Sequence, residues 1–359
     1  MASQHTRVHT EGSSQFDPDG LFNAWESGQK ALPEDNDLRS SIISTFHLPP
    51  SDDYVYHATA SVTLAQVQGA IKHGGGSGLH AWYLDGEGKP LPPPPQPDVL
   101  AYISIFAPNT ATSKVLTGFA ANAKKGSIRA KVASHLQTQR ILPSDMVIPK
   151  SKKYVNPYYD FWCWSCQDLE WAGPEEGTVN IKTSHHILPI FMHHFGCVVP
   201  SYEGLQIIKQ KVEKRSVVEI GSGNGYWTYM LRRLGVSVQA VDNLQSEYRT
   251  LWISDTIMKD GERFLKDEKG CKDAVLLFVY PIISSGFTSK ILETYKGDTI
   301  CVAGTQNRNG YTAFKDRTID EYIKAERTEF QKTIQIPLPS FAGKDEALFV
   351  FERKGRETS

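Results

Sequence analysis

The sequence predicts an α/β fold in which a mostly parallel sheet ends in an antiparallel hairpin. Three observations carry this prediction. Strand-like and helix-like stretches alternate from residue 201 to residue 353, a glycine-rich turn joins the first strand to the helix after it, and a short polar loop alone separates the last two strands. Residues 20–150 lack this alternation, and we expect an extension of mixed or mainly helical structure there.

The first strand and its turn lie at residues 217–227, Val-Val-Glu-Ile-Gly-Ser-Gly-Asn-Gly-Tyr-Trp. After Glu219, glycine occupies every second position: Gly221, Gly223 and Gly225. Glycine is needed where a strand turns sharply into a helix and the backbone approaches a ligand closely. The dinucleotide fingerprint G-x-G-x-x-G requires a glycine where this chain has Tyr226. The motif is therefore E-x-G-x-G-x-G.

The remaining elements follow in chain order. Ser201 is the predicted N-cap of a helix that enters the first strand. The second strand, Val236–Val241, ends at Asp242, where an acidic residue can accept hydrogen bonds from both ribose hydroxyls of a nucleoside. Further strands are predicted at Leu251–Met258, Asp273–Tyr280, Thr299–Ala303, Lys332–Leu338 and Ala347–Phe351, with helices near Thr288–Tyr295 and Ile319–Ile323.

This constellation resembles motif I and its surroundings in class I, Rossmann-like S-adenosylmethionine-dependent methyltransferases. The resemblance covers about residues 185–353 and implies the sheet order 3-2-1-4-5-7-6 with S-adenosyl-L-methionine as cofactor. It implies that Glu219 and the three glycines surround the methionine part of the cofactor, and that Asp242 holds the ribose. It also implies an acidic residue near the adenine after the third strand, for which Asp260 fits and Asp255 is the alternative.

The sequence indicates the methyl acceptor less clearly than it indicates the cofactor. The fourth strand ends in Val-Tyr-Pro-Ile at 279–282, where many amino-methyltransferases have Asn/Asp-Pro-Pro-Tyr/Phe. The wider pattern is similar to a little-characterised methyltransferase-like subgroup with Trp-Pro-Pro at this place. We expect Tyr280 and Pro281 to line the substrate pocket. Gln306 and Asn307, in the loop after the fifth strand, either bind a polar substrate or form a self-satisfied turn.

No catalytic group is identified, and the candidates are Tyr280, His185 and His186. A core or surface position is the simpler explanation of the histidines. A zinc site built from Cys163, Cys166, His193 and Cys197 is the alternative to buried free thiols, and we expect no metal.

The composition of the chain limits the partners and the compartment that we expect. A net charge of −1 does not favour nucleic acid as a partner. No apolar run is long enough for a membrane span, and five scattered cysteines indicate reduced thiols in the cytoplasm or the nucleus. Residues 1–19 are predicted to be a disordered tail, 20–150 an extension of unknown role and 151–355 the cofactor-binding domain.

Two functions remain open. The first is a methyltransferase acting on a small molecule or a protein, and the second is a binding or regulatory protein that keeps the fold without catalysis. An NAD-dependent oxidoreductase is disfavoured by Tyr226 and by the terminal hairpin. The oligomeric state stays open.

Overall fold

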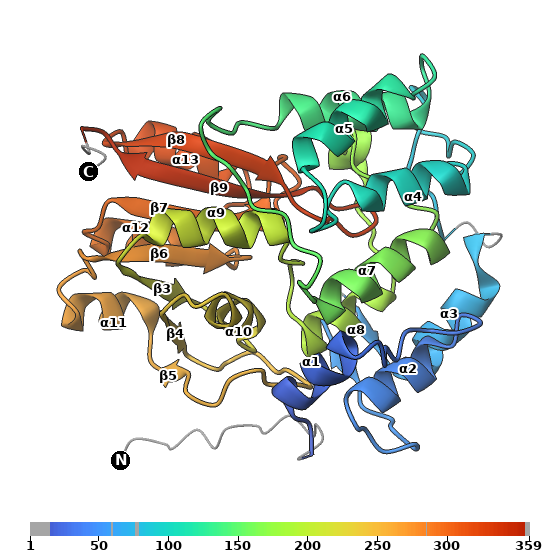
Figure 1. The fold of residues 1–359 in the computed structure, drawn as a ribbon, viewed down its shortest axis with the longest axis horizontal. Helices are drawn as coiled ribbons and strands as arrows, with labels where there is room; N and C mark the ends of the chain where they lie inside the picture. Colours follow the sequence, from blue (N-terminus) through green and yellow to red (C-terminus); the bar gives the residue numbers. More distant parts are fainter. Residues whose placement is uncertain (1–14, 59, 76–78, 285, 356–359) are drawn as a thin grey trace.

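The computed structural model describes residues 15–58, 60–75, 79–284 and 286–355. Its centre is a seven-stranded sheet in the order β5-β4-β3-β6-β7-β9-β8 (Figure 1). The strands are β3 Ser216–Ile220, β4 Val238–Asp242, β5 Ile257–Met258, β6 Ala274–Val279, β7 Thr299–Thr305, β8 Phe330–Pro337 and β9 Glu346–Arg353. The strands from β5 to β7 are parallel, and β9 runs antiparallel to both of its neighbours. When the seven strands of this sheet are numbered in chain order, the order is 3-2-1-4-5-7-6, which is the order that the resemblance implies.

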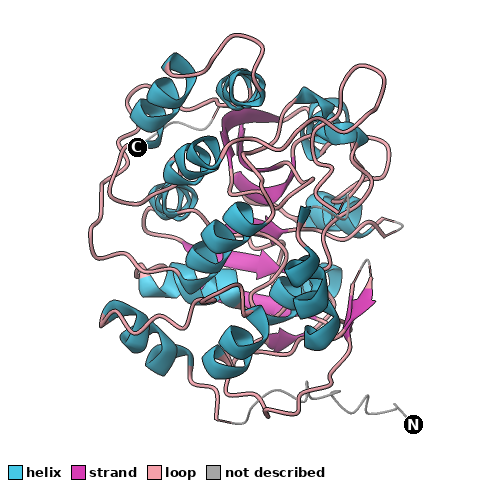
Figure 2. Ribbon diagram, turned by 90° about the vertical axis from the view of Figure 1, so that its right-hand side faces the viewer, coloured by secondary structure: helices cyan, strands magenta, loops and turns pink. Residues whose placement is uncertain are grey.

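Helices cover both faces of the sheet (Figure 2). Because successive strand residues point to opposite faces, Val217 packs in one buried cluster with Leu205 and Met230, whereas Val218 packs in another with Phe264. The first face carries α9 Tyr202–Val212 and α10 Tyr226–Arg233, and the second carries α11 Gly261–Asp267, α12 Phe287–Thr294 and α13 Ile319–Glu326. The result is a three-layer α/β sandwich.

The chain before the sheet is mainly helical and lies along one side of it (Figure 1). It contains α1 Pro18–Glu26, α2 Leu38–Thr45, the short hairpin β1 Tyr56–His57 and β2 Ser61–Val62, α3 Leu64–His73, α4 Gln96–Ser104, α5 Thr112–Ala121 and α6 Ile128–Thr138. It is followed by α7 Pro157–Asp168, the 3₁₀-helix η2 Glu176–Asn180 and α8 Ile187–His194. Phe22, Tyr102 and Leu136 of this part belong to the same buried cluster as Leu205 and Val350.

The predicted disordered tail needs correction. Pro18 and Asp19 were expected in a disordered tail but begin α1, because Asp17 caps the helix and Phe22 and Trp25 are buried. Residues 1–14 of that tail lie outside the described residues.

The third strand is also shorter than predicted. Only Ile257–Met258 pair with β4, whereas Leu251–Met258 was expected. Trp252 instead donates its backbone N–H to the Asn224 carbonyl at 2.9 Å and its indole N–H to the His194 carbonyl at 2.6 Å. These contacts hold the apolar run against α8 and the glycine turn.

One edge of the sheet is joined to the extension. Ile141 exchanges both backbone hydrogen bonds with Gln335 of β8, at 2.7 and 2.9 Å. The strand at the opposite edge, β5, has two residues.

Every helix in the described part of the chain is too short or too polar to cross a lipid bilayer.

Candidate functional site

The turn between β3 and α10 has the conformation that its glycines predict. Gly221, Gly223 and Gly225 have φ values of 76°, 58° and 83°, in the left-handed region that side chains disfavour. A Cβ atom at Gly223 would also lie 2.7 Å from the Tyr248 hydroxyl oxygen, and one at Gly225 would overlap Ile253. The backbone conformation therefore favours glycine at all three positions, and packing adds a second reason at Gly223 and Gly225.

A cavity of about 550 Å³ lies at the carboxyl ends of the parallel strands. Gly221 and Asp242 contribute the ends of β3 and β4, and Val279 contributes the end of β6. Other walls come from earlier in the chain, because His57 and Ala58 of the β1–β2 hairpin line the same cavity. Open α/β sheets bind their ligands at this edge.

Asp242 connects the glycine turn to the loop after β4. Its carboxylate accepts backbone N–H groups from Gly223 at 2.9 Å and from Leu244 at 2.6 Å. A carboxylate has about four lone-pair directions, so these bonds leave capacity for ligand hydroxyl groups. Asp242 lines the cavity, as expected of a ribose-binding residue.

Glu219 lies deeper. Its side chain accepts the Thr228 hydroxyl, and burial raises the pKa of this carboxyl to about 8. It borders a second, small cavity of about 40 Å³ together with residues 221–224 of the glycine turn. In that turn the Ser222 hydroxyl and the Asn224 amide nitrogen are buried without a hydrogen-bond partner among the described residues. Buried polar atoms are normally paired, so the turn fits a ligand that carries polar groups.

Asp260 is exposed and is not among the residues that line the larger cavity. It is the N-cap of α11, and its carboxylate accepts the Arg263 N–H at 2.9 Å. Its neighbours Lys259 and Gly261 line the cavity. Asp255 forms an ion pair with Arg232 at 2.8 Å on the surface, away from the lining.

Tyr280 and Pro281 line the cavity beside the end of β6. Tyr280 has a φ of 52°, and its N–H donates to the Ala303 carbonyl at 2.7 Å. A bulky residue in this conformation is strained, and such strain is frequent at functional sites. Burial raises the pKa of Tyr280 far above its usual value, so its hydroxyl stays protonated.

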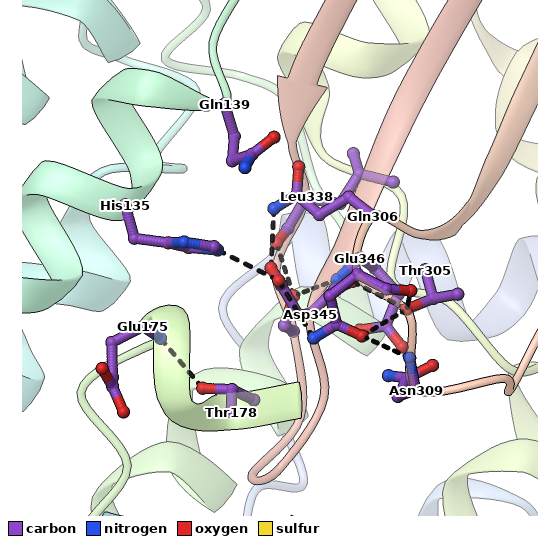
Figure 3. Close-up of polar contacts among 12 residues, drawn as sticks. His135, Gln139, Glu175, Thr178, Thr305, Gln306, Asn309, Leu338, Asp345 and Glu346 are labelled. Carbon is purple, nitrogen blue, oxygen red and sulfur yellow. Dashed lines mark hydrogen bonds and ion pairs between the residues drawn. The ribbon is translucent and has the colours of Figure 1, made fainter. Parts of the chain in front are cut away.

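Gln306 and Asn307 lie outside the lining of both cavities. Their amide groups donate to the two carboxylate oxygens of Asp345, at 2.6 and 3.2 Å. His135 of α6 contacts the same carboxylate at 3.0 Å, so this network also joins the extension to the β8–β9 hairpin (Figure 3). The amide donors are thus engaged within the protein, which is the self-satisfied alternative left open by the sequence.

His185 and His186 do not line either cavity. His185 accepts the Ile187 N–H at 3.1 Å and packs its ring against His80, and burial lowers its pKa to about 3. The histidines of the cavity wall are His57 and His193. A carbonyl oxygen only accepts, so the 2.8 Å contact from His193 Nε2 to the His57 carbonyl places the proton on Nε2.

The residues considered for zinc are dispersed. Cys163 and Cys166 lie on α7, where burial raises the pKa of both thiols, and Cys197 lines both cavities. Across the described ranges, no group of three or more His, Cys, Asp or Glu side chains is arranged to hold a metal ion.

No protein-family model and no curated protein sequence matches this chain. Several solved structures, in contrast, do match this chain. A SAM-dependent methyltransferase from Archaeoglobus fulgidus matches with a TM-score of 0.32 at 11% identity, over 42% of this chain and 94% of its own. A 1,6-didemethyltoxoflavin-N1-methyltransferase from Burkholderia thailandensis matches with a TM-score of 0.31 at 11% identity, over 42% and 78%. A SAM-dependent methyltransferase from Agrobacterium tumefaciens matches with a TM-score of 0.27 at 12% identity, over 42% and 60%.

The strand order decides the fold independently of these scores. Five parallel strands in the order 3-2-1-4-5, with the seventh strand inserted antiparallel between the fifth and the sixth, distinguish this sheet from a plain dinucleotide-binding sheet. The part of the chain from α9 to β9 has the Rossmann-like fold of class I S-adenosylmethionine-dependent methyltransferases.

Proposed function

We propose that this protein is an S-adenosylmethionine-dependent methyltransferase that acts on a small-molecule or protein acceptor. The observation that carries the proposal is the placement of Asp242 and Gly221 on one cavity at the ends of adjacent parallel strands. An acidic residue beside a glycine turn at this edge is the arrangement that a nucleoside with a charged tail requires.

The residues present fit this cofactor. The turn from Gly221 to Gly225 and the start of α10 would face the methionine carboxylate, with the Ser222 hydroxyl and the Asn224 amide offering hydrogen bonds. Asp242 would hold the ribose and Asp260 would approach the adenine, while Glu219 would lie beneath the methionine part. The cofactor supplies an electrophilic methyl group when bound, and the protein's task is positioning.

Tyr280 and Pro281 are the proposed neighbours of the acceptor, and Tyr280 is the proposed catalytic candidate that lines the cavity. Gln306 and Asn307 would act by holding the loop after β7. The absence of an Asn or Asp at position 279 or 280 supports the second candidate function, a protein that binds the cofactor without catalysis. Five free cysteines support a reducing compartment, the cytoplasm or the nucleus.

Calorimetric titration of the full chain with S-adenosylhomocysteine and, separately, with NAD tests the cofactor class. We expect one site for S-adenosylhomocysteine and no heat of binding for NAD. NAD binding without an S-adenosylhomocysteine signal would reject the proposal in favour of an oxidoreductase.

Turnover distinguishes the two candidate functions. The protein is incubated with methyl-labelled cofactor and with fractionated metabolites or proteins, and labelled product is sought. Cofactor binding with no labelled product in any fraction would favour the non-catalytic alternative.

A further inference from the structure

We infer that the end of the cavity bounded by the β1–β2 hairpin and α8 binds a small, flat aromatic molecule without anionic groups. This inference rests on the proposed function, because the opposite end would hold the nucleoside of the cofactor. It narrows the methyl acceptor to one chemical class.

The lining of the cavity divides by element. The ends of β3, β4 and β5 contribute Gly221, Asp242 and Lys259. The hairpin contributes His57 and Ala58, α8 contributes Met192 and His193, and Cys197, which also borders the glycine turn, follows α8. Tyr280 and Phe287, from the chain after β6, complete the lining. The cavity therefore extends past the strand ends into a compartment that the early part of the chain builds.

Hydrogen bonds hold this compartment's wall in place. His193 Nε2 donates to the His57 carbonyl at 2.8 Å, and the Tyr56 hydroxyl contacts His194 Nε2 at 3.0 Å. Just before the hairpin, Asp52 forms a buried ion pair with Arg249. A small molecule fits the cavity, whose volume of about 550 Å³ is typical of small-molecule sites.

The side chains of the compartment favour a flat aromatic ligand. Tyr280 and Met192 offer a ring and a polarisable sulfur atom, and the Tyr248 ring lies near His193 of α8. Phe287, Cys197 and the Tyr248 hydroxyl border the glycine turn, where the two ends of the cavity meet. Aromatic rings stack on the faces of other aromatic rings, and sulfur contacts ring edges favourably.

The charged side chains of the cavity lining disfavour an anionic ligand. The charged residues on the lining are Asp242, Glu247 and Lys259. The ammonium of Lys259 already pairs with Asp267 at 2.5 Å. Asp242 and Lys259 belong to the strand ends where the cofactor would bind, so a carboxylate or phosphate near α8 would meet the acidic Glu247, which acts on His193. Sites for such anions use arginine or lysine. A neutral or cationic heteroaromatic ring would not be repelled by an acidic side chain.

Two matched probes test the inference on the full chain: quinoline, and the anion quinoline-4-carboxylate. Binding is followed by saturation-transfer NMR, with and without S-adenosylhomocysteine. Ala58→Trp fills the compartment, and Val55→Trp, at an exposed position outside the lining, is the matched control. We expect quinoline to bind and its carboxylate to bind at least about tenfold more weakly, a difference of about 1.4 kcal/mol.

Ala58→Trp should weaken quinoline binding by about tenfold or more and leave the S-adenosylhomocysteine affinity unchanged, and Val55→Trp should change neither. Equal binding of the two probes, or quinoline binding that persists in Ala58→Trp, overturns the inference. S-adenosylhomocysteine binding without quinoline binding rejects the inference alone. Quinoline binding that Ala58→Trp removes, in a protein with no affinity for S-adenosylhomocysteine, rejects the proposed function and keeps the aromatic compartment.

Discussion

Asp242 makes the most direct prediction about a single residue. In Asp242→Asn the amide oxygen can still accept one backbone N–H, but the charged acceptor for the ribose hydroxyls is lost. A hydrogen bond to a charged group contributes about 1.5–3 kcal/mol, so the affinity for S-adenosylhomocysteine should fall by one to two orders of magnitude, roughly, in calorimetry. Asp255→Asn, which alters only a surface ion pair, is the control. An unchanged affinity in Asp242→Asn would mean that the ribose lies elsewhere.

Because the Glu219 carboxyl is buried, we expect the free energy of unfolding to depend on pH. Its pKa in the folded protein is about 8, against an ordinary value of 4.5, because burial disfavours the charged form. Between these values the folded state keeps a proton that the unfolded state releases, so the free energy of unfolding falls as the pH rises, by up to about 1.4 kcal/mol per pH unit. This contribution is complete below the unfolded pKa and is lost as the pH rises through the folded pKa.

Glu219→Gln removes that proton linkage while it keeps an acceptor for Thr228. Urea unfolding of the protein without ligand, at several pH values from about 5 to about 8, should give a flatter dependence for the variant than for the wild type. Other buried acids contribute to both proteins and cancel in the comparison. Identical slopes would contradict the buried, proton-holding state of Glu219.

At the scale of elements, the loop after β4 depends on the segment before β1. Arg249 of that loop pairs with Asp52, and both side chains are almost fully buried. Asp52→Asn leaves a buried guanidinium without its counter-charge and should cost about 3–5 kcal/mol of unfolding free energy. The double variant Asp52→Asn/Arg249→Met should recover part of this loss, because it buries no unpaired charge.

Chemical denaturation of the single and double variants measures this coupling. Glu87→Gln is the control, since Glu87 and Lys89 form an exposed ion pair whose contribution should stay below about 1 kcal/mol. If the double variant is less stable than the sum of the single variants predicts, the ion pair does not act as a unit.

The same elements show what the sequence could predict. The placement of Asp242 at a strand end could be predicted because a strand, a glycine turn and a strand end are local patterns of a few residues, whereas the sheet order came from the resemblance that these patterns carry. The short β5 could not, since Trp252 is held by Asn224 and His194 rather than by its neighbours in the chain. His57 and Ala58 reach the cavity through contacts with α8, and no periodicity around them indicates that position.

At the scale of the whole molecule, the early chain and the sheet share one buried cluster. The division at residue 150 is a proposal from the sequence, and several contacts cross it. Arg140 donates to Glu203 of α9 at 2.9 Å, and His135 contacts Asp345 at 3.0 Å.

We therefore expect the fragment 151–359 to lack a cooperative unfolding transition in circular dichroism, in contrast to the full chain. Without the early chain it would expose the apolar surface that packs on Tyr102 and Leu136. A fragment that unfolds cooperatively and binds S-adenosylhomocysteine would show instead that the sheet is an independent domain.

The pairing of Ile141 with Gln335 has a consequence for how copies of this protein meet in a crowded solution. An unpaired edge strand offers its backbone to a neighbouring molecule and so favours aggregation and fibril growth. Here the β8 edge is partly occupied by the chain's own Ile141, and the β5 edge offers only two residues. The sheet thus gives another copy little backbone to extend, and variants that detach the segment around Ile141 would expose β8 to intermolecular strand pairing.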